Sequence, residues 1–74
     1  MSTLRTRYSA SIEVAITKAT AMRDHATVAA SDGAEVYAYP KPEGRIAWGV
    51  NAAETGANIL RGVRRPDGAD EAVS

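Results

Sequence analysis

The sequence contains no cysteine, no phenylalanine and only one histidine among its 74 residues. Without cysteine the chain can form neither a disulfide framework nor a thiolate zinc site. A single histidine cannot complete a transition-metal site of several imidazole ligands or a Cys/His catalytic pair. The absence of cysteine also agrees with a reducing compartment, and we expect a cytoplasmic protein.

Large aliphatic side chains are scarce as well, because leucine, isoleucine and valine together account for only 12 of 74 residues. That share lies below the roughly 20% typical of disordered chains, but disorder also requires a high net charge, and the net charge here is zero. Fifteen alanines add packing surface. We therefore expect one small, marginally stable domain. No stretch approaches the roughly 20 apolar residues of a membrane span, so no membrane partner is expected.

The zero net charge conceals an asymmetry along the chain. All nine basic side chains lie within residues 1–65, whereas residues 66–74 contain three acidic side chains and no basic one. The run Pro66-Asp67-Gly68 is typical of a break in regular structure. The sequence therefore predicts a mildly basic domain over residues 1–65, followed by a flexible acidic tail over residues 66–74.

Three β-prone runs separated by two turns form the most ordered pattern in the chain. The predicted strands are Thr27–Ser31, Ala34–Tyr39 and Arg45–Val50. Asp32-Gly33 favours a type I′ hairpin turn, because glycine tolerates the positive φ that this turn requires. The second turn, Pro40-Lys41-Pro42-Glu43-Gly44, combines two prolines with a glycine. Together these signals predict an antiparallel three-stranded meander.

Before the meander, apolar residues recur at spacings of three and four, which predicts a helix from about Ser11 to Asp24. Its apolar face comprises Ile12, Ala15, Ile16, Ala19, Met22 and Ala26. We expect it to end near His25, although an extension to Ala30 with a stop at Gly33 is an alternative. The helix should cover the sheet face that carries Val36, Ile46, Trp48 and Val50.

Two flanking segments complete the predicted architecture. Leu4–Tyr8 alternates with period two, which is typical of a half-buried strand. Asn51-Ala52-Ala53-Glu54 matches a helix start with a capping residue, which predicts a short helix from Ala52 to about Arg61. The predicted fold class is therefore α+β: strand, helix, three-stranded antiparallel meander and short C-terminal helix.

The search for catalytic chemistry is negative. His25 lies near a predicted helix C-terminus, where an imidazolium would interact favourably with the helix dipole, and this explanation is simpler than a catalytic role. The glycines form no phosphate-binding loop, and no motif marks a nucleophile. We therefore expect no enzyme activity, no cofactor, no metal site and no small-molecule substrate.

A binding surface is better supported by the pattern. Alternation places Tyr37 and Tyr39 on the sheet face away from the helix, with Arg45 beside them. Arg5 and Arg7 would join this face if the first strand pairs nearby, and Arg61, Arg64 and Arg65 would form a second basic patch. Tyrosine and arginine are enriched at protein interfaces, and they also suit nucleic acids. An ordinary solvated sheet face explains the tyrosines equally well, and Trp48 is expected to be a core residue.

The order strand, helix and meander over residues 3–50, with glycine turns at Asp32-Gly33 and Glu43-Gly44, resembles small phage-encoded anti-CRISPR proteins, particularly inhibitors of type I surveillance complexes. The resemblance implies a non-enzymatic protein that binds a crRNA-guided complex in a bacterial host cell and blocks its binding to target DNA. The segment Asn51–Ser74 departs from that pattern, and no interface residue carries over individually.

Two further alternatives come from the residues themselves. The mildly basic body with adjacent tyrosines would suit a small nucleic-acid-binding regulator of phage or plasmid origin, although the acidic tail opposes phosphate binding. Composition does not separate an inhibitor from a toxin–antitoxin partner. An exposed sheet edge would allow two copies to pair, so both a monomer and a homodimer are expected states.

Overall fold

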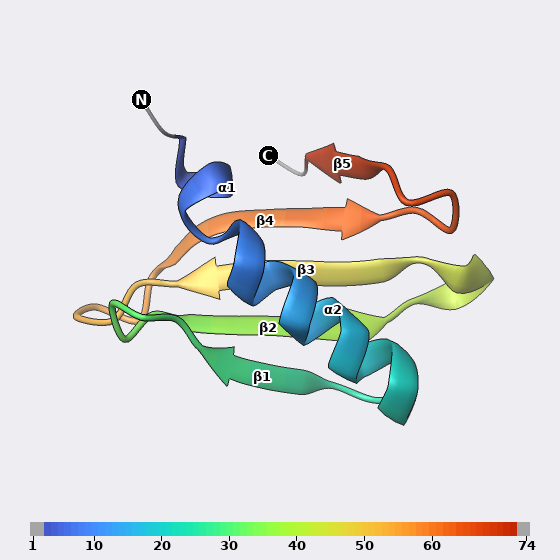
Figure 1. Ribbon diagram of the computed structural model, residues 1–74, viewed down its shortest axis with the longest axis horizontal. Helices are drawn as coiled ribbons and strands as arrows, with labels where there is room; N and C mark the ends of the chain where they lie inside the picture. Colours follow the sequence, from blue (N-terminus) through green and yellow to red (C-terminus); the bar gives the residue numbers. More distant parts are fainter. Residues whose placement is uncertain (1–2, 73–74) are drawn as a thin grey trace.

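Two helices pack on one face of a five-stranded antiparallel sheet, in a computed structural model that describes residues 3–72 (Figure 1). The predicted α+β class is confirmed. The strands follow one another in chain order across the sheet. The elements are α1 (Leu4–Arg7), α2 (Ser9–Met22), β1 (Ala26–Ala29), β2 (Glu35–Pro40), the 3-10 turn η1 (Pro42–Gly44), β3 (Ile46–Asn51), β4 (Asn58–Arg64) and β5 (Asp70–Ala72).

The helix α2 and the first three strands, β1 to β3, match the prediction closely. The buried residues of α2 are Ile12, Ala15, Ile16 and Ala19, which are four of the six residues predicted for its apolar face. The prediction is wrong for the other two, because Met22 is 58% exposed and Ala26 belongs to β1. This face covers a sheet surface on which Val36 and Val50 are fully buried. The helix ends at Met22, and the capping residue Arg23, whose φ is 55°, turns the chain toward β1. The predicted stop near His25 is therefore confirmed, and the alternative extension to Ala30 is wrong.

The predicted strand over Leu4–Tyr8 is wrong, because this segment forms the short helix α1. Thr3 caps it, since its Oγ1 accepts a hydrogen bond from the Thr6 backbone N–H at 3.2 Å. Tyr8 leaves helical geometry and separates α1 from α2, and the residue is only 5% exposed. Five residues of alternation are too short a pattern to outweigh a capped turn that buries an aromatic ring.

The predicted helix over Ala52–Arg61 is also wrong, because its first six residues form a turn and Asn58–Arg61 belong to a fourth strand. The chain turns at Ala52–Ala57, where the Ala52 N–H donates to the Ala57 carbonyl at 2.8 Å and Gly56 has a φ of +71°. The capping signal at Asn51 marks this turn and not a helix. From Asn58 onward, β4 pairs with β3 and extends the sheet.

The predicted flexible tail is wrong for Asp70–Ala72, which forms β5 and pairs antiparallel with β4. The sheet therefore continues beyond the predicted domain end at residue 65. Residues 73–74 of the predicted tail lie outside the described residues.

The hairpins β1–β2 and β4–β5 use the same turn, at residues 30–34 and 65–69. In each, the first residue donates to the carbonyl of the fifth, and the glycine donates to the carbonyl of the first. Only Gly33 and Gly68 have positive φ within these turns, so the predicted type I′ turn is wrong. The geometry is a type I turn followed by a glycine bulge. The aspartate before each glycine accepts a hydrogen bond from the following alanine N–H at 2.9 Å.

Candidate binding surface on the open face of the sheet

Tyr37 and Tyr39 stand together on the sheet face opposite α2, as the alternation of β2 predicts. Their ring centroids are 6.3 Å apart and the ring planes differ by 11°, so the two rings are stacked. Tyr37 is half-buried, whereas Tyr39 remains 41% exposed. The pair therefore forms an aromatic ridge on an otherwise uncovered surface.

The position of Tyr37 depends on the glycine opposite it. Tyr37 pairs with Gly49 on β3, and a Cβ atom at Gly49 would lie 2.2 Å from the Tyr37 hydroxyl oxygen. The ring thus lies over the bare glycine backbone. Its hydroxyl accepts a hydrogen bond from Asn58 Nδ2 at 3.3 Å. Tyr37 is therefore half-buried over the β3 backbone, while the neighbouring Tyr39 presents its ring to solvent.

A shallow hollow of about 160 Å³, here called the tyrosine pocket, lies beside the two rings. It is lined by Tyr37, Tyr39, Lys41, Ala47, Trp48, Arg61, Gly62 and Val63. Within residues 3–72, neither Lys41 nor Arg61 has a carboxylate within 4.0 Å. The pocket therefore combines aromatic walls with two cations that no described acidic side chain neutralises.

Of the six predicted arginines, only Arg61 lies at this pocket. Arg5 and Arg7 belong to α1, so their predicted place on the open face is wrong. Arg45 precedes β3 and lines a different hollow with the last turn of α2, while its Nε donates to the Pro42 carbonyl at 3.4 Å. Its predicted place beside the tyrosines is wrong as well.

The predicted patch of Arg61, Arg64 and Arg65 does not form, because the three lie on a strand and its following turn. Register places Arg64 beside Ile46 and Asp70, on the side of the sheet that the helices cover. Arg65 lies near two carboxylates, at 3.8 Å from Asp67 and 4.0 Å from Glu71. Because side chains alternate between the two faces of the sheet, Arg61 lies on the open face and Arg64 on the face that the helices cover.

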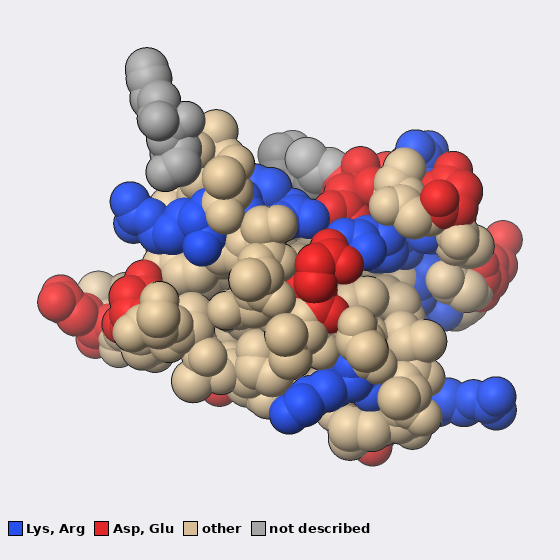
Figure 2. Space-filling model, in the orientation of Figure 1, with Lys and Arg blue, Asp and Glu red and all other residues tan. Residues whose placement is uncertain are grey.

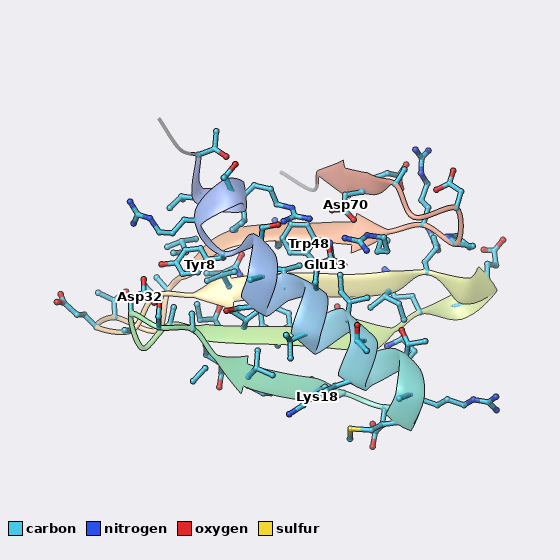
Figure 3. All side chains as sticks on the ribbon, in the orientation of Figure 1. Tyr8, Glu13, Lys18, Asp32, Trp48 and Asp70 are labelled. Carbon is cyan, nitrogen blue, oxygen red and sulfur yellow. The ribbon has the colours of Figure 1, made fainter. Side chains whose placement is uncertain are left out.

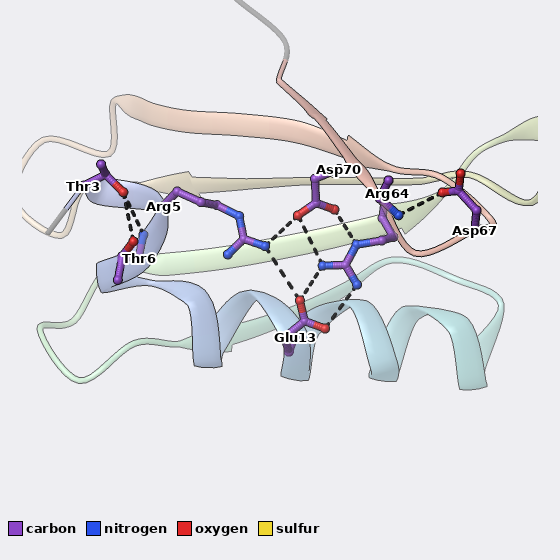
Figure 4. A network of polar contacts seen from close by, with 8 residues as sticks. Thr3, Arg5, Thr6, Glu13, Arg64, Asp67 and Asp70 are labelled. Atoms are coloured by element: carbon purple, nitrogen blue, oxygen red, sulfur yellow. Dashed lines mark hydrogen bonds and ion pairs between the residues drawn. The ribbon is translucent and has the colours of Figure 1, made fainter.

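Arg5 and Arg64 belong to an ion-pair network on the helix side, with Glu13 and Asp70 (Figure 4). Arg5 donates to Asp70 Oδ2 at 2.6 Å, and Arg64 Nη1 donates to Glu13 Oε1 at 3.1 Å. Further bonds join Arg64 to both carboxylates. Figure 2 shows the resulting interleaved acidic and basic side chains on this face.

The network moves the pKa values of its carboxyl groups. The hydrogen bond from Arg64 lowers the pKa of Glu13 below its usual value. Burial acts to raise the pKa of Asp70, but hydrogen bonds from Arg64 and Arg5 outweigh it, so that pKa is also lowered. Hydrogen bonds to Glu13 and Asp70 raise the pKa of Arg64. Both acids are therefore ionised at neutral pH and hold two of the predicted binding arginines in structural roles.

Trp48 is a core residue, as predicted, and is only 3% exposed. Its ring lies against Gly62 of β4, where a Cβ atom would be 2.5 Å from Trp48 Cζ2. The Arg5 guanidinium lies 5.0 Å from the ring centroid, within cation–π range. Arg5 thus packs on the buried Trp48 ring and belongs to the ion-pair network, and it does not lie on the open face.

Sequence reasoning missed Lys41, Gly49 and Asn58 as parts of the site. Lys41 follows Tyr39 by two positions, so the period-two rule could have placed it beside the ridge. Gly49 lies between Trp48 and Val50 on β3 and therefore faces the side of the sheet opposite to theirs. A glycine opposite an aromatic residue on a paired strand indicates that the ring covers the glycine, and this pattern could have located the site. Asn58 could not be found, because its segment was predicted to be helical.

Within residues 3–72, no group of three potential metal ligands converges. His25 is exposed beyond the end of α2, and its backbone N–H donates to Asp24 Oδ1 at 2.8 Å. No helix in this part of the chain has the length and apolar character to cross a bilayer. The tyrosine pocket is therefore the feature from which function can be argued.

No protein-family model, curated protein or solved structure matches the chain.

Proposed function

We propose that this protein is a non-enzymatic binding protein that contacts a protein partner through its tyrosine pocket. The observation that carries the proposal is the stacked Tyr37–Tyr39 pair beside a hollow whose cations, Lys41 and Arg61, have no carboxylate within 4.0 Å among the described residues. Tyrosine and arginine are enriched among the few residues that carry most of the binding energy in protein interfaces.

The size of the pocket favours a protein partner over a small molecule. Sites for drug-sized ligands occupy roughly 300–1,000 Å³, whereas this hollow has about 160 Å³ and is open to solvent. It is large enough for one inserted side chain of a partner. The two cations at its margin favour a partner segment that carries a carboxylate next to that side chain.

A single-stranded nucleic acid is the competing ligand, because bases stack on exposed tyrosines and phosphates bind arginine and lysine. The distribution of charge argues against it. Four arginines (Arg5, Arg45, Arg64 and Arg65) already have a carboxylate within 4.0 Å, and the net charge is zero. Few cations remain for the phosphate contacts on which such affinity depends.

As the partner we propose a type I crRNA-guided surveillance complex, whose binding to target DNA the protein would block. This choice rests on the resemblance of element order and turn placement to small anti-CRISPR proteins. The structure removes one part of that resemblance, since the chain begins with a helix and not with a strand. The proposal of a protein-binding surface does not depend on this choice of partner.

A gel shift of target DNA by purified type I surveillance complexes tests both the proposed partner and the preference for a protein over a nucleic acid. We expect the protein to abolish the shift of at least one complex while causing no shift of single- or double-stranded DNA alone. If complexes of several subtypes are unaffected, the proposed partner is wrong. A shift by the protein alone would favour the nucleic-acid regulator.

Two charge reversals locate the surface. Arg61→Glu alters the tyrosine pocket, whereas Arg7→Glu makes the same change on α1, outside it. We expect Arg61→Glu and Tyr39→Ala to weaken inhibition at least tenfold and Arg7→Glu to leave it unchanged. Equal effects of Arg61→Glu and Arg7→Glu would contradict the pocket as the binding site.

A further inference from the structure

The two edges of the sheet differ in how they are protected. β5 carries Asp70 and Glu71, and charged side chains on an edge strand oppose pairing with another chain. β1, with the sequence Ala26-Thr27-Val28-Ala29, contains no charged residue and no proline, and its register with β2 is uninterrupted. Figure 1 shows β1 along the lower margin, with no strand beyond it. β1 therefore lacks three devices that prevent edge pairing: a charged side chain, a proline and a bulge.

The hydrogen-bond pattern identifies which groups of β1 point outward. Ala30 donates to the Ala34 carbonyl at 2.9 Å where the hairpin closes. Because paired residues alternate along an antiparallel ladder, Val28 and Ala26 direct their backbone groups toward β2. Thr27 and Ala29 must then direct theirs away from the sheet. Among the described residues, no turn or loop contact engages these two N–H groups or their carbonyls.

We propose that β1 pairs antiparallel with β1 of a second copy, around a two-fold axis at Val28. In that register, Thr27 faces Ala29 of the partner subunit, and Ala29 faces the partner's Thr27. Each facing pair exchanges two hydrogen bonds, so four bonds form and every outward group of Thr27 and Ala29 is satisfied. The strand is complementary to itself, as a two-fold interface requires.

The side chains around β1 suit such an interface. Met22 is the most exposed large hydrophobic residue described, at 58%. It lies four positions after Lys18 and so shares its flank of α2. Figure 3 shows Lys18 on the β1 side of this helix, whereas Glu13 contacts Arg64 on the other side. A second copy at β1 would cover Met22 together with the half-buried Val28, which leaves less apolar surface in water.

The arrangement has a consequence for the opposite surface. A two-fold axis through paired Val28 residues stands perpendicular to the sheet, so both copies keep their helices on one side. The ten strands form one continuous sheet, and the two tyrosine pockets open on its other side. The pairing itself does not depend on the function proposed above.

Sedimentation velocity over a wide concentration range tests the proposal with two variants at one position. Thr27→Pro removes an outward N–H, and edge strands tolerate proline at such positions. Thr27→Val keeps the N–H and the shape. We expect dimers in the unmodified protein and in Thr27→Val, and monomers at all concentrations in Thr27→Pro with an unchanged circular dichroism spectrum. A monomeric unmodified protein, or a Thr27→Pro dimer of equal affinity, would overturn the proposal.

Amide hydrogen exchange gives a second test that needs no variant, should Thr27→Pro fail to fold. We expect the Val28 amide to be protected at every concentration, because it bonds to β2. The Thr27 and Ala29 amides should become protected only at concentrations where the dimer forms. A dimer in which these two amides still exchange freely uses another surface, for example the tyrosine pocket, and would also overturn the proposal. If the Thr27 and Ala29 amides become protected only after a foreign protein is added, that protein and not a second copy pairs with β1, and the proposal is overturned.

Discussion

Two aromatic rings lie over glycines on opposite faces of the same sheet. Trp48 covers Gly62 on the helix side, and Tyr37 covers Gly49 on the open side. In a chain with only four aromatic residues, this arrangement lets each ring cover the backbone of the neighbouring strand. The glycines serve here by their lack of a side chain and not by unusual φ values, since neither has positive φ.

The two glycines should respond differently to alanine. A Cβ at Gly62 would lie 2.5 Å from the buried Trp48 ring and 2.9 Å from the Glu71 carbonyl oxygen, so neither neighbour can move freely. We expect Gly62→Ala to lower the free energy of unfolding by about 1–3 kcal/mol, measured by urea denaturation. Gly49→Ala should cost less, because Tyr37 can swing toward solvent. A smaller loss for Gly62→Ala than for Gly49→Ala would contradict this account.

The Tyr8 hydroxyl donates a hydrogen bond to Asp32 Oδ2 and ties the start of α2 to the first hairpin. This bond raises the pKa of Tyr8 above its usual 10.0 and lowers that of Asp32 below its usual 3.8. The stability that comes from the lowered pKa of Asp32 is present above pH 3.8, and it is lost as the pH falls through the folded-state pKa. The stability that comes from the raised pKa of Tyr8 is present below pH 10.0, and it is lost as the pH rises through the folded-state pKa.

Tyr8→Phe therefore has a predictable pH signature. We expect the stability difference between the unmodified protein and Tyr8→Phe to be largest between about pH 4 and pH 10 and to shrink on both sides. Urea denaturation across this range measures it. A difference that stays constant with pH would show that only the packing of the ring matters.

At the scale of elements, the same five-residue turn appears twice, and both copies need glycine. Gly33 and Gly68 have φ values of +88° and +91°, a region that costs other residues about 1–2 kcal/mol. We expect Gly68→Ala to lower the free energy of unfolding by about this amount, as Gly33→Ala should, in thermal denaturation. If Gly68→Ala had no effect while Gly33→Ala did, β5 would not contribute to the folded state.

The ion-pair network fastens β5 to both helices, because Asp70 bonds to Arg5 of α1 and to Arg64, which in turn bonds to Glu13 of α2. Asp70→Asn should lower the free energy of unfolding by on the order of 1 kcal/mol at neutral pH, since hydrogen bonds to charged groups contribute that much or more. Asp67→Asn in the neighbouring turn is the matched control, because asparagine can keep its bond to Ala69. Equal losses in chemical denaturation would contradict a special role for the network.

At the scale of the whole molecule, a chain of this size has about 5–10 kcal/mol of stability, and its core centres on one large ring. Trp48→Ala should lower the free energy of unfolding by about 3–5 kcal/mol, a large part of that stability, as urea denaturation followed by circular dichroism would show. Trp48→Phe is the control, because it keeps an aromatic ring and removes the indole N–H, which is buried without a partner among the described residues. Similar losses for both variants would mean that the ring is not the main packing element.

The sequence predicted those parts of the site whose pattern is local. Alternation along β2 placed Tyr37 and Tyr39 on the uncovered face, and the same rule would have placed Lys41 there. Arg61 was predicted to bind a partner, but on a helix that does not exist. Arg5 and Arg64 were misplaced, because each is engaged by a carboxylate distant in sequence: Asp70 lies 65 positions from Arg5, and Glu13 lies 51 positions from Arg64. No local pattern reveals such a pair.

By itself, the sequence determined α2, the strands β1 to β3 and the faces they bury, because hydrophobic periodicity and turn residues act over a few positions. Tertiary structure decided the segments at both ends. Residues 58–64 became a strand because the β3 edge offered hydrogen-bond partners beside Trp48, and Asp70–Ala72 then paired with that new edge. It also decided which cations face solvent, since long-range ion pairs neutralised Arg5 and Arg64 and left Lys41 and Arg61 beside the tyrosines.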